Sequence, residues 1–185
     1  MANANEHSIV KIASNLAMAC FISGLVIGAV YYVTAPVAAQ KAEEMKQESM
    51  RYLVAEADSF ADIPGEEGCF AAQKDGSTVA YIIPSESKGY GGKIKLLVAV
   101  DIEGKVLDFN ILEHNETPGL GDNAQKPDFR KQFAGKGPEL LEVTKDPNNK
   151  DNIQAMTGAT ISSRAVAKGV KEAAEKAASL AKGGR

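Results

Sequence analysis

The chain has 185 residues and a formal net charge of −3, with 21 Lys and Arg against 24 Asp and Glu. This weakly acidic balance argues against a nucleic-acid-binding protein, which carries a basic face. Hydrophobic residues make up 44% of the chain and charged residues 24%, a globular rather than a disordered composition. Two His and two Cys leave almost nothing from which to build a metal site. We therefore expect no bound metal, and any redox chemistry requires an organic cofactor.

The N-terminal segment is apolar and free of charge from Ile12 to Gln40. At 1.5 Å per residue, the most apolar part, residues 12–33, covers about 33 Å, which is enough to cross a hydrocarbon core. A cleaved signal peptide is the alternative, because Val37-Ala38-Ala39 resembles a cleavage site, but its apolar core is usually only about 7–15 residues long. The sequence therefore predicts a short tail over 1–11 and an uncleaved transmembrane helix over 12–35. The flanking charges do not decide the orientation; a short tail inside and the domain outside is the simpler arrangement.

Beyond the apolar segment, the sequence predicts a connecting helix followed by an α+β domain. Helix formers dominate residues 36–62, and Ile63-Pro64-Gly65 ends that helix. The domain over 63–185 begins with two hairpins, 69–74 with 78–84 and 93–101 with 105–113, whose apolar residues alternate as in an antiparallel sheet with one buried face. The alternation changes phase by one residue between Val106 and Phe109. A short helix over 127–133, a strand over 140–144 and an amphipathic helix over 160–182 complete the fold.

Three loops rich in Gly and Thr connect predicted elements of this domain. Residues 88–92 hold three glycines, which permit close approach of the backbone to a planar ligand or a phosphate, although such turns are also common before strands. Residues 116–122 combine a tight Pro-Gly turn with an apolar Leu120 at the apex, where it could pack on an aromatic ring system; the other interpretation is a plain hairpin exit. His114, just upstream, is interpreted as a solvated or hydrogen-bonded side chain rather than a base.

The third loop, residues 156–163, lies where the last helix begins. Free N–H groups and hydroxyls converge at a helix N-terminus, which suits an anion such as a phosphate beside an esterifiable hydroxyl. The alternative is a simple N-cap made by Thr157 or Thr160, with Ser163 playing no part.

Taken together and in this order after one apolar span, three motifs resemble a known family: Gly89-Tyr90-Gly91-Gly92, Glu116-Thr117-Pro118-Gly119-Leu120-Gly121 and Thr157-Gly158-Ala159-Thr160. They are similar to the FMN-binding domain of membrane redox complexes, found in the G subunit of the Rnf complex, an ion-translocating ferredoxin:NAD⁺ oxidoreductase. The C subunit of the Na⁺-translocating NADH:quinone reductase is a related, usually longer protein. The resemblance covers nearly the whole chain.

The resemblance implies a covalent flavin. In these families a flavin transferase attaches FMN from FAD, through a phosphoester, to the last Thr of the third motif, which is Thr160 here. The resemblance further implies an electron-relay subunit on the outer face of the cytoplasmic membrane, with iron–sulfur and flavin subunits as partners and no acid–base catalyst of its own. Expected cofactor-binding residues are Thr160, Thr157, Gly158, Ala159 and Ser162 at the phosphate and ribityl end, Thr117, Gly119, Leu120 and Gly121 beside the ring system, and Tyr90 and Gly91 nearby.

Two alternatives and one departure accompany this interpretation. The same domain serves quinone reductases and could serve a stand-alone tethered electron carrier; a non-redox membrane-anchored binding or assembly protein, in which the third motif only caps a helix, is the alternative from another class. The family commonly has an Asp three residues before the first hydroxyl residue of the third motif, where this chain has Gln154.

Overall fold

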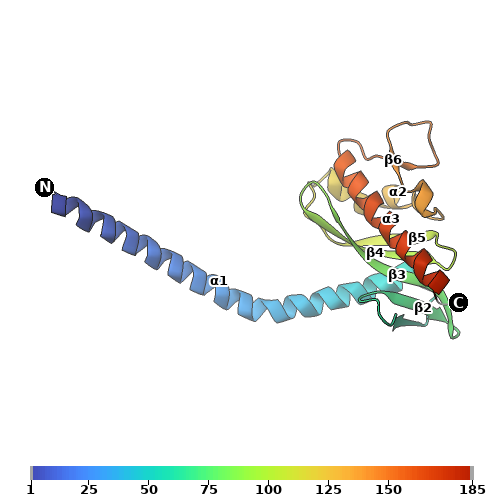
Figure 1. Cartoon of the computed structure of the whole chain (residues 1–185), viewed down its shortest axis with the longest axis horizontal. Helices are drawn as coiled ribbons and strands as arrows, with labels where there is room; N and C mark the ends of the chain where they lie inside the picture. Colours follow the sequence, from blue (N-terminus) through green and yellow to red (C-terminus); the bar gives the residue numbers. More distant parts are fainter. Residues whose placement is uncertain (1, 184–185) are drawn as a thin grey trace. The chain divides into compact units, whose positions relative to one another are not determined.

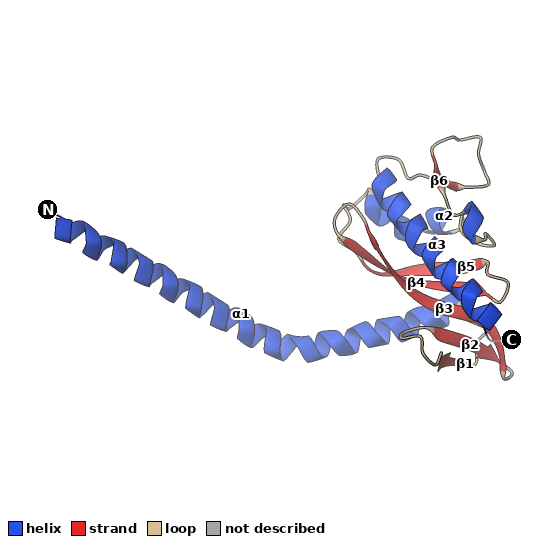
Figure 2. Cartoon of the chain, in the orientation of Figure 1, coloured by secondary structure: helices blue, strands red, loops and turns tan. Residues whose placement is uncertain are grey.

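A computed structural model describes residues 2–183 of the chain, which fall into two compact units that meet between Glu44 and Met45. The elements are the helix α1 (Ala2–Leu53), the strands β1 (Ser59–Asp62), β2 (Phe70–Lys74), β3 (Ser77–Lys88), β4 (Lys93–Asp101) and β5 (Val106–Glu113), the short helices η1 (Gly121–Gln125), α2 (Pro127–Arg130) and η2 (Pro138–Leu140), the strands β6 (Val143–Thr144) and β7 (Ile153–Gln154), and the helix α3 (Thr160–Gly183) (Figures 1 and 2).

The first unit is the helical segment up to Glu44. Its apolar side chains are open to the surroundings; Phe21, for example, is 68% exposed. Such exposure is unfavourable in water and normal in lipid. The helix from Ile9 onward is long and apolar enough to cross a membrane. α1 continues through Pro36, so no break separates the predicted transmembrane helix from the segment that follows it.

The second unit is built on a five-stranded antiparallel sheet whose strands follow one another in chain order from β1 to β5. α3 crosses one face of this sheet against β3 and β4 (Figure 1). The opposite face is covered within the same unit by the last turns of α1, where Met50 and Leu53 pack on residues of β2, β3 and β4. Alternate residues of β4 therefore enter two different cores: Leu96 and Val98 face α3, and Leu97 faces α1.

The phase change predicted in the second hairpin is confirmed. The register between β4 and β5 pairs Ala99 with Asp108 and Val100 with Val106, which leaves Leu107 as an extra residue on β5. A β-bulge of this kind shifts the alternation by one position, so that Val106 and Phe109 both reach the core under α3.

The predicted fold class is correct, and three local predictions need correction. The connecting helix predicted over 36–62 ends at Leu53, because Met50, Leu53 and Val54 already fill the core beneath the sheet. Residues 59–62 instead form β1, whose main chain pairs with β2. The predicted strand over 140–144 is only the two-residue β6, and it pairs in parallel with β7, which the sequence did not reveal.

Candidate functional site

The three motifs found in the sequence meet at one end of the second unit. The first is the turn that joins β3 to β4, where Gly89 N–H donates to the carbonyl of Gly92 at 2.7 Å. The second follows β5 and leads into η1, and the third connects β7 to the first turn of α3. The sheet and α3 thus bring together loops that lie far apart in the sequence.

An open pocket of about 650 Å³ lies where these loops meet, which is within the size range of small-molecule sites. Eight of the residues expected to bind a cofactor line it, together with two others that the sequence did not single out, Lys145 and Ile161. The eight are Tyr90, Thr117, Leu120, Gly121, Gly158, Ala159, Thr160 and Ser162. Its apolar side chains remain open to solvent; Leu120 is 42% exposed and Tyr90 72%.

A buried carboxylate behind this pocket connects the three motifs. The side chain of Glu116, in a residue only 6% exposed, accepts the Gly91 N–H at 2.9 Å through Oε1 and the Ser162 hydroxyl through Oε2. Gly91 belongs to the first motif, Glu116 to the second and Ser162 to the third. Gly91 is therefore held by its backbone behind the pocket and does not line it, unlike the contact expected from the sequence.

The glycines of the first two motifs leave room for that carboxylate. A Cβ at Gly89 would lie 2.3 Å from Glu116 Oε1, and one at Gly121 would lie 2.6 Å from Glu116 Oε2. At Gly91 a Cβ would lie 1.8 Å from the carbonyl oxygen of Asn115. These distances are too short for any side chain, so the backbones of Gly89 and Gly121 pack directly on the Glu116 side chain and that of Gly91 on the backbone of Asn115.

The first turn of α3 is organised by Ser163 rather than by a threonine cap. Its buried hydroxyl oxygen accepts the Met156 N–H and donates to the Ala159 carbonyl, each at 2.9 Å. Within residues 9–182, whose side chains the structure describes, neither Thr157 nor Thr160 makes a side-chain hydrogen bond. The alternative interpretation, in which a threonine caps the helix and Ser163 plays no part, is therefore wrong, and Thr160 lines the pocket with a hydroxyl that makes no hydrogen bond to the described residues.

Replacing Ser163 by alanine should destabilise this turn. The Ser163→Ala variant leaves the Met156 N–H without its partner, and the free energy of unfolding should fall by about 1–2 kcal/mol. Ser179→Ala, which changes an exposed serine of the same helix bonded to the Lys176 carbonyl, is the control and should stay within about 0.5 kcal/mol of wild type. Urea unfolding followed by far-ultraviolet circular dichroism measures both; equal midpoints for the two variants would contradict the role of Ser163.

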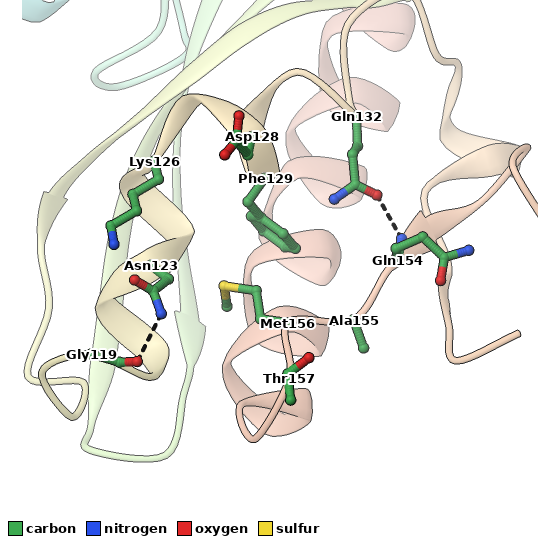
Figure 3. Close-up of a pocket in the computed structure, with 10 residues that line it drawn as sticks. All are labelled: Gly119, Asn123, Lys126, Asp128, Phe129, Gln132, Gln154, Ala155, Met156 and Thr157. Carbon is green, nitrogen blue, oxygen red and sulfur yellow. Dashed lines mark hydrogen bonds between the residues drawn. The ribbon is translucent and has the colours of Figure 1, made fainter. Parts of the chain in front are cut away.

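A second pocket of about 550 Å³ lies beside the third motif, between η1 and the segment from β7 to Thr157 (Figure 3). Two expected site residues, Gly119 and Thr157, line this pocket and not the first one. Gln154 lies here too: its main-chain N–H donates to Gln132 Oε1 at 2.7 Å, and its side-chain amide donates to the carbonyls of Asp146 and Asn149. An Asp at position 154 has no N–H in its side chain, so it could not donate these last two bonds.

Sequence reasoning missed three residues of the site for identifiable reasons. Lys145 lies 15 residues before Thr160 in an unremarkable polar loop, and Ile161 looks like an ordinary exposed helix position. Glu116 stands inside the second motif, but only the tertiary structure reveals its two donors. His114 is satisfied as expected, because its Nδ1 accepts the Glu116 N–H at 3.1 Å.

Comparison with known proteins defines the class. Residues 89–175 match the model of the FMN-binding domain family. The sheet and its helices resemble the crystal structure of Shewanella oneidensis NqrC, with a TM-score of 0.52 and 20% identity over 70% of this chain and 73% of that one. The C subunit of the Na⁺-translocating NADH-quinone reductase from Parabacteroides distasonis gives a TM-score of 0.51 and 24% identity over 61% of this chain and 60% of that one. The protein therefore contains an FMN-binding domain.

The family follows from the relatives. The chain is 57% identical to the G subunit of the proton-translocating ferredoxin:NAD⁺ oxidoreductase complex of Clostridium ljungdahlii, over 92% of each protein. It is 40% identical to the G subunit of the ion-translocating oxidoreductase complex of Salmonella typhimurium over 63% of this chain, and spans 59% of that longer protein. The chain belongs to the G-subunit family of ion-translocating ferredoxin:NAD⁺ oxidoreductase, or Rnf, complexes.

The residues of the first pocket are suited to hold FMN. Glycine at position 158 has φ +75°, and a Cβ there would lie 3.2 Å from Leu120 Cδ2, so the backbone of the third motif and the apolar side chain of the second are packed in contact. Thr160 opens the 24-residue helix α3, whose first N–H groups have no intrahelical acceptors. With Lys145 on the same pocket, these groups suit a phosphate, while Leu120 and Tyr90 suit an aromatic ring system.

Proposed function

We propose that this protein is the electron-relay subunit of an Rnf-type complex and that it carries FMN through a phosphoester bond to Thr160. One observation supports this assignment above the others. The Thr160 hydroxyl makes no side-chain hydrogen bond within the described residues, and Thr160 lines a pocket to which all three motifs contribute, inside the segment that matches the FMN-binding domain. A plain helix cap would instead use the hydroxyl of Thr157 or Thr160 to bind the backbone.

The attachment is a group transfer at the Thr160 oxygen. A flavin transferase would supply FAD; the bond from Thr160 Oγ1 to phosphorus forms as the pyrophosphate bond of FAD breaks, adenosine monophosphate leaves, and the hydroxyl gives up its proton. The N–H groups of the first turn of α3 and the cation of Lys145 stabilise the charge of the phosphate. The ring system of FMN, when bound, would supply the redox chemistry that an electron-relay subunit needs.

The chain's own residues position this cofactor and exclude water from one side of it. Leu120 and Tyr90 offer apolar surface for the ring system, and Thr117 and Gly121 complete the wall beneath it. Gly158, Ala159 and Ser162 line the end nearest the phosphate. Gly91 acts from behind the pocket through its bond to Glu116, and Gly119 and Thr157, which line the second pocket, would contribute only by shaping the loops. No residue serves as a general acid or base in this proposal.

The N-terminal helix would hold the flavin domain at the membrane. We place the tail over 1–11 and the transmembrane helix over 12–35, and we assign the last turns of α1 and β1 to the FMN-binding domain, because both belong to the unit that begins at Met45. The domain would lie on the extracytoplasmic side of the cytoplasmic membrane, beside the iron–sulfur and flavin subunits of the complex. Protease added to intact spheroplasts should then degrade the domain while a cytoplasmic marker survives. A domain that survives the protease would show the opposite orientation.

The test of the function is a covalent flavin on the purified chain. Protein from cells that express a flavin transferase should show the intact mass of the polypeptide plus one FMN residue, and its denatured band should fluoresce under ultraviolet light. A non-redox anchoring protein would show the bare mass and no fluorescence. Copurification with ferredoxin:NAD⁺ oxidoreductase activity rather than quinone reductase activity separates the Rnf assignment from the quinone reductase alternative, and the 57% identity to an Rnf-type G subunit favours the former.

A further inference from the structure

We propose that Glu116 is the positioning residue of the flavin site: its carboxylate holds the turn 89–92 and the start of α3 against its own loop, so that the pocket exists before FMN arrives. This inference rests on the proposed function and deepens it. Glu116 does not line the pocket and would not touch the cofactor. It acts through Gly91 and Ser162, which belong to the other two motifs.

The contacts of the carboxylate span the whole site. Gly91 lies 25 residues before Glu116 in the chain, and Ser162 lies 46 residues after it. Ser162 lines the pocket two residues after Thr160, in the first turn of the same helix. A carboxylate that fixes Ser162 therefore also fixes the backbone from which the Thr160 side chain projects, because both residues belong to one rigid helical turn.

The surroundings allow this carboxylate little freedom. Gly89 and Gly121 are so close to its oxygens that a Cβ at either position would collide with them. Glu116 is 6% exposed, and among the described side chains no Lys or Arg forms a salt bridge with it. A buried acid held only by neutral donors costs stability that an apolar residue would not. A buried carboxylate without a basic partner is expected where function requires side chains and loops to be held in one arrangement.

Two variants break the same contact from opposite ends. Glu116→Gln keeps an oxygen for the Gly91 N–H, but its amide nitrogen can only donate to the Ser162 hydroxyl, so that the bond to a charged acceptor is lost and only a neutral one can replace it. Ser162→Ala removes that hydroxyl and leaves the carboxylate in place. If the contact positions Thr160, each variant slows attachment of FMN by about tenfold, the usual effect of losing a hydrogen bond to a charged group. The double variant should be no slower than either single one, because the same interaction is lost only once.

The experiment uses the full chain in detergent, produced without flavin, with purified flavin transferase and FAD; intact mass follows the attachment. Glu113→Gln is the matched control: Glu113 is an exposed partner of Lys95 on β5 and should react at the wild-type rate. Hydrogen–deuterium exchange of the flavin-free protein gives a second readout that does not involve the cofactor. Exchange should rise in residues 89–92 and in the first turn of α3, and stay unchanged in β4.

Three results would overturn this proposal and leave the proposed function standing. Attachment at the wild-type rate in both single variants means that the contact positions nothing. Additive effects in the double variant mean that Glu116 and Ser162 act separately. Faster exchange throughout β4 means that Glu116 supports overall stability rather than the site. A wild-type chain that takes no flavin at all would overturn the proposed function itself, and this inference with it.

Discussion

Thr160→Ala protein, expressed with a flavin transferase, should have the mass of the unmodified polypeptide. It should also give no fluorescent band after denaturing electrophoresis. The expected loss is complete because alanine offers no oxygen to phosphorus, and the two neighbouring hydroxyls in the first turn of α3 are already engaged. Ser162 is turned towards Glu116, and Ser163 is committed to the Met156 N–H and the Ala159 carbonyl. The measurement is intact mass, compared with wild type from the same host.

Two controls separate loss of the ester from loss of the fold. Thr160→Ser keeps a hydroxyl at the same backbone position and should retain the flavin mass. Thr78→Ala removes a threonine of β3, far from the site in the sequence and absent from the pocket, and should be modified like wild type. A flavin mass that survives in Thr160→Ala would assign the attachment to another residue and refute the proposed site.

Gly91→Ala should lower the free energy of unfolding by about 3 kcal/mol, near the upper end for overpacking, because its Cβ would lie 1.8 Å from the Asn115 carbonyl oxygen. That oxygen belongs to the backbone and cannot turn aside as a side chain would. The turn 89–92 would have to move away from the second motif, and the Gly91 N–H would lose Glu116. Attachment of FMN should slow as well. Urea unfolding of the full chain in detergent measures the first effect, and intact mass the second.

Gly137→Ala is the matched control for that variant. Its Cβ would meet only the carboxylate of Glu139, the far end of an exposed and flexible side chain. The substitution should therefore be neutral, or stabilise the protein slightly by restricting the unfolded chain. If Gly91→Ala unfolds at the same urea concentration as Gly137→Ala, the close packing of the first motif on the second does not contribute to the free energy of unfolding.

The substitutions at Thr160 and Gly91 change different properties of the same site. Thr160 supplies a reactive atom, and its loss should leave the fold intact. Gly91 matters because it has no side chain. Replacing it should strain the fold, while the Thr160 oxygen remains in place. A flavin-free but stable Thr160→Ala and a destabilised, slowly modified Gly91→Ala would together separate the chemistry of the site from its architecture.

Local patterns determined most of the elements. Alternation in 93–101 and 106–113 predicts a hairpin because neighbouring side chains of a strand face opposite sides, and even the bulge at Leu107 is visible as a change of phase. The apolar stripe of α3 and the uncharged run beginning at Ile12 are equally local signals. The sequence does not predict β1, because this strand lies in a polar stretch and forms only through pairing with β2.

The sequence by itself predicted, through its resemblance to FMN-binding domains, that a hydroxyl at the start of the last helix and two glycine-rich loops belong to one site, since the order of these motifs is readable along the chain. Only the tertiary structure decided which of those residues face the pocket, that Lys145 joins them, and that Glu116 connects all three loops from behind. The physical reason is that hydrogen bonds such as the one from Ser162 to Glu116 join residues 46 positions apart, and no local pattern encodes a partner at that distance.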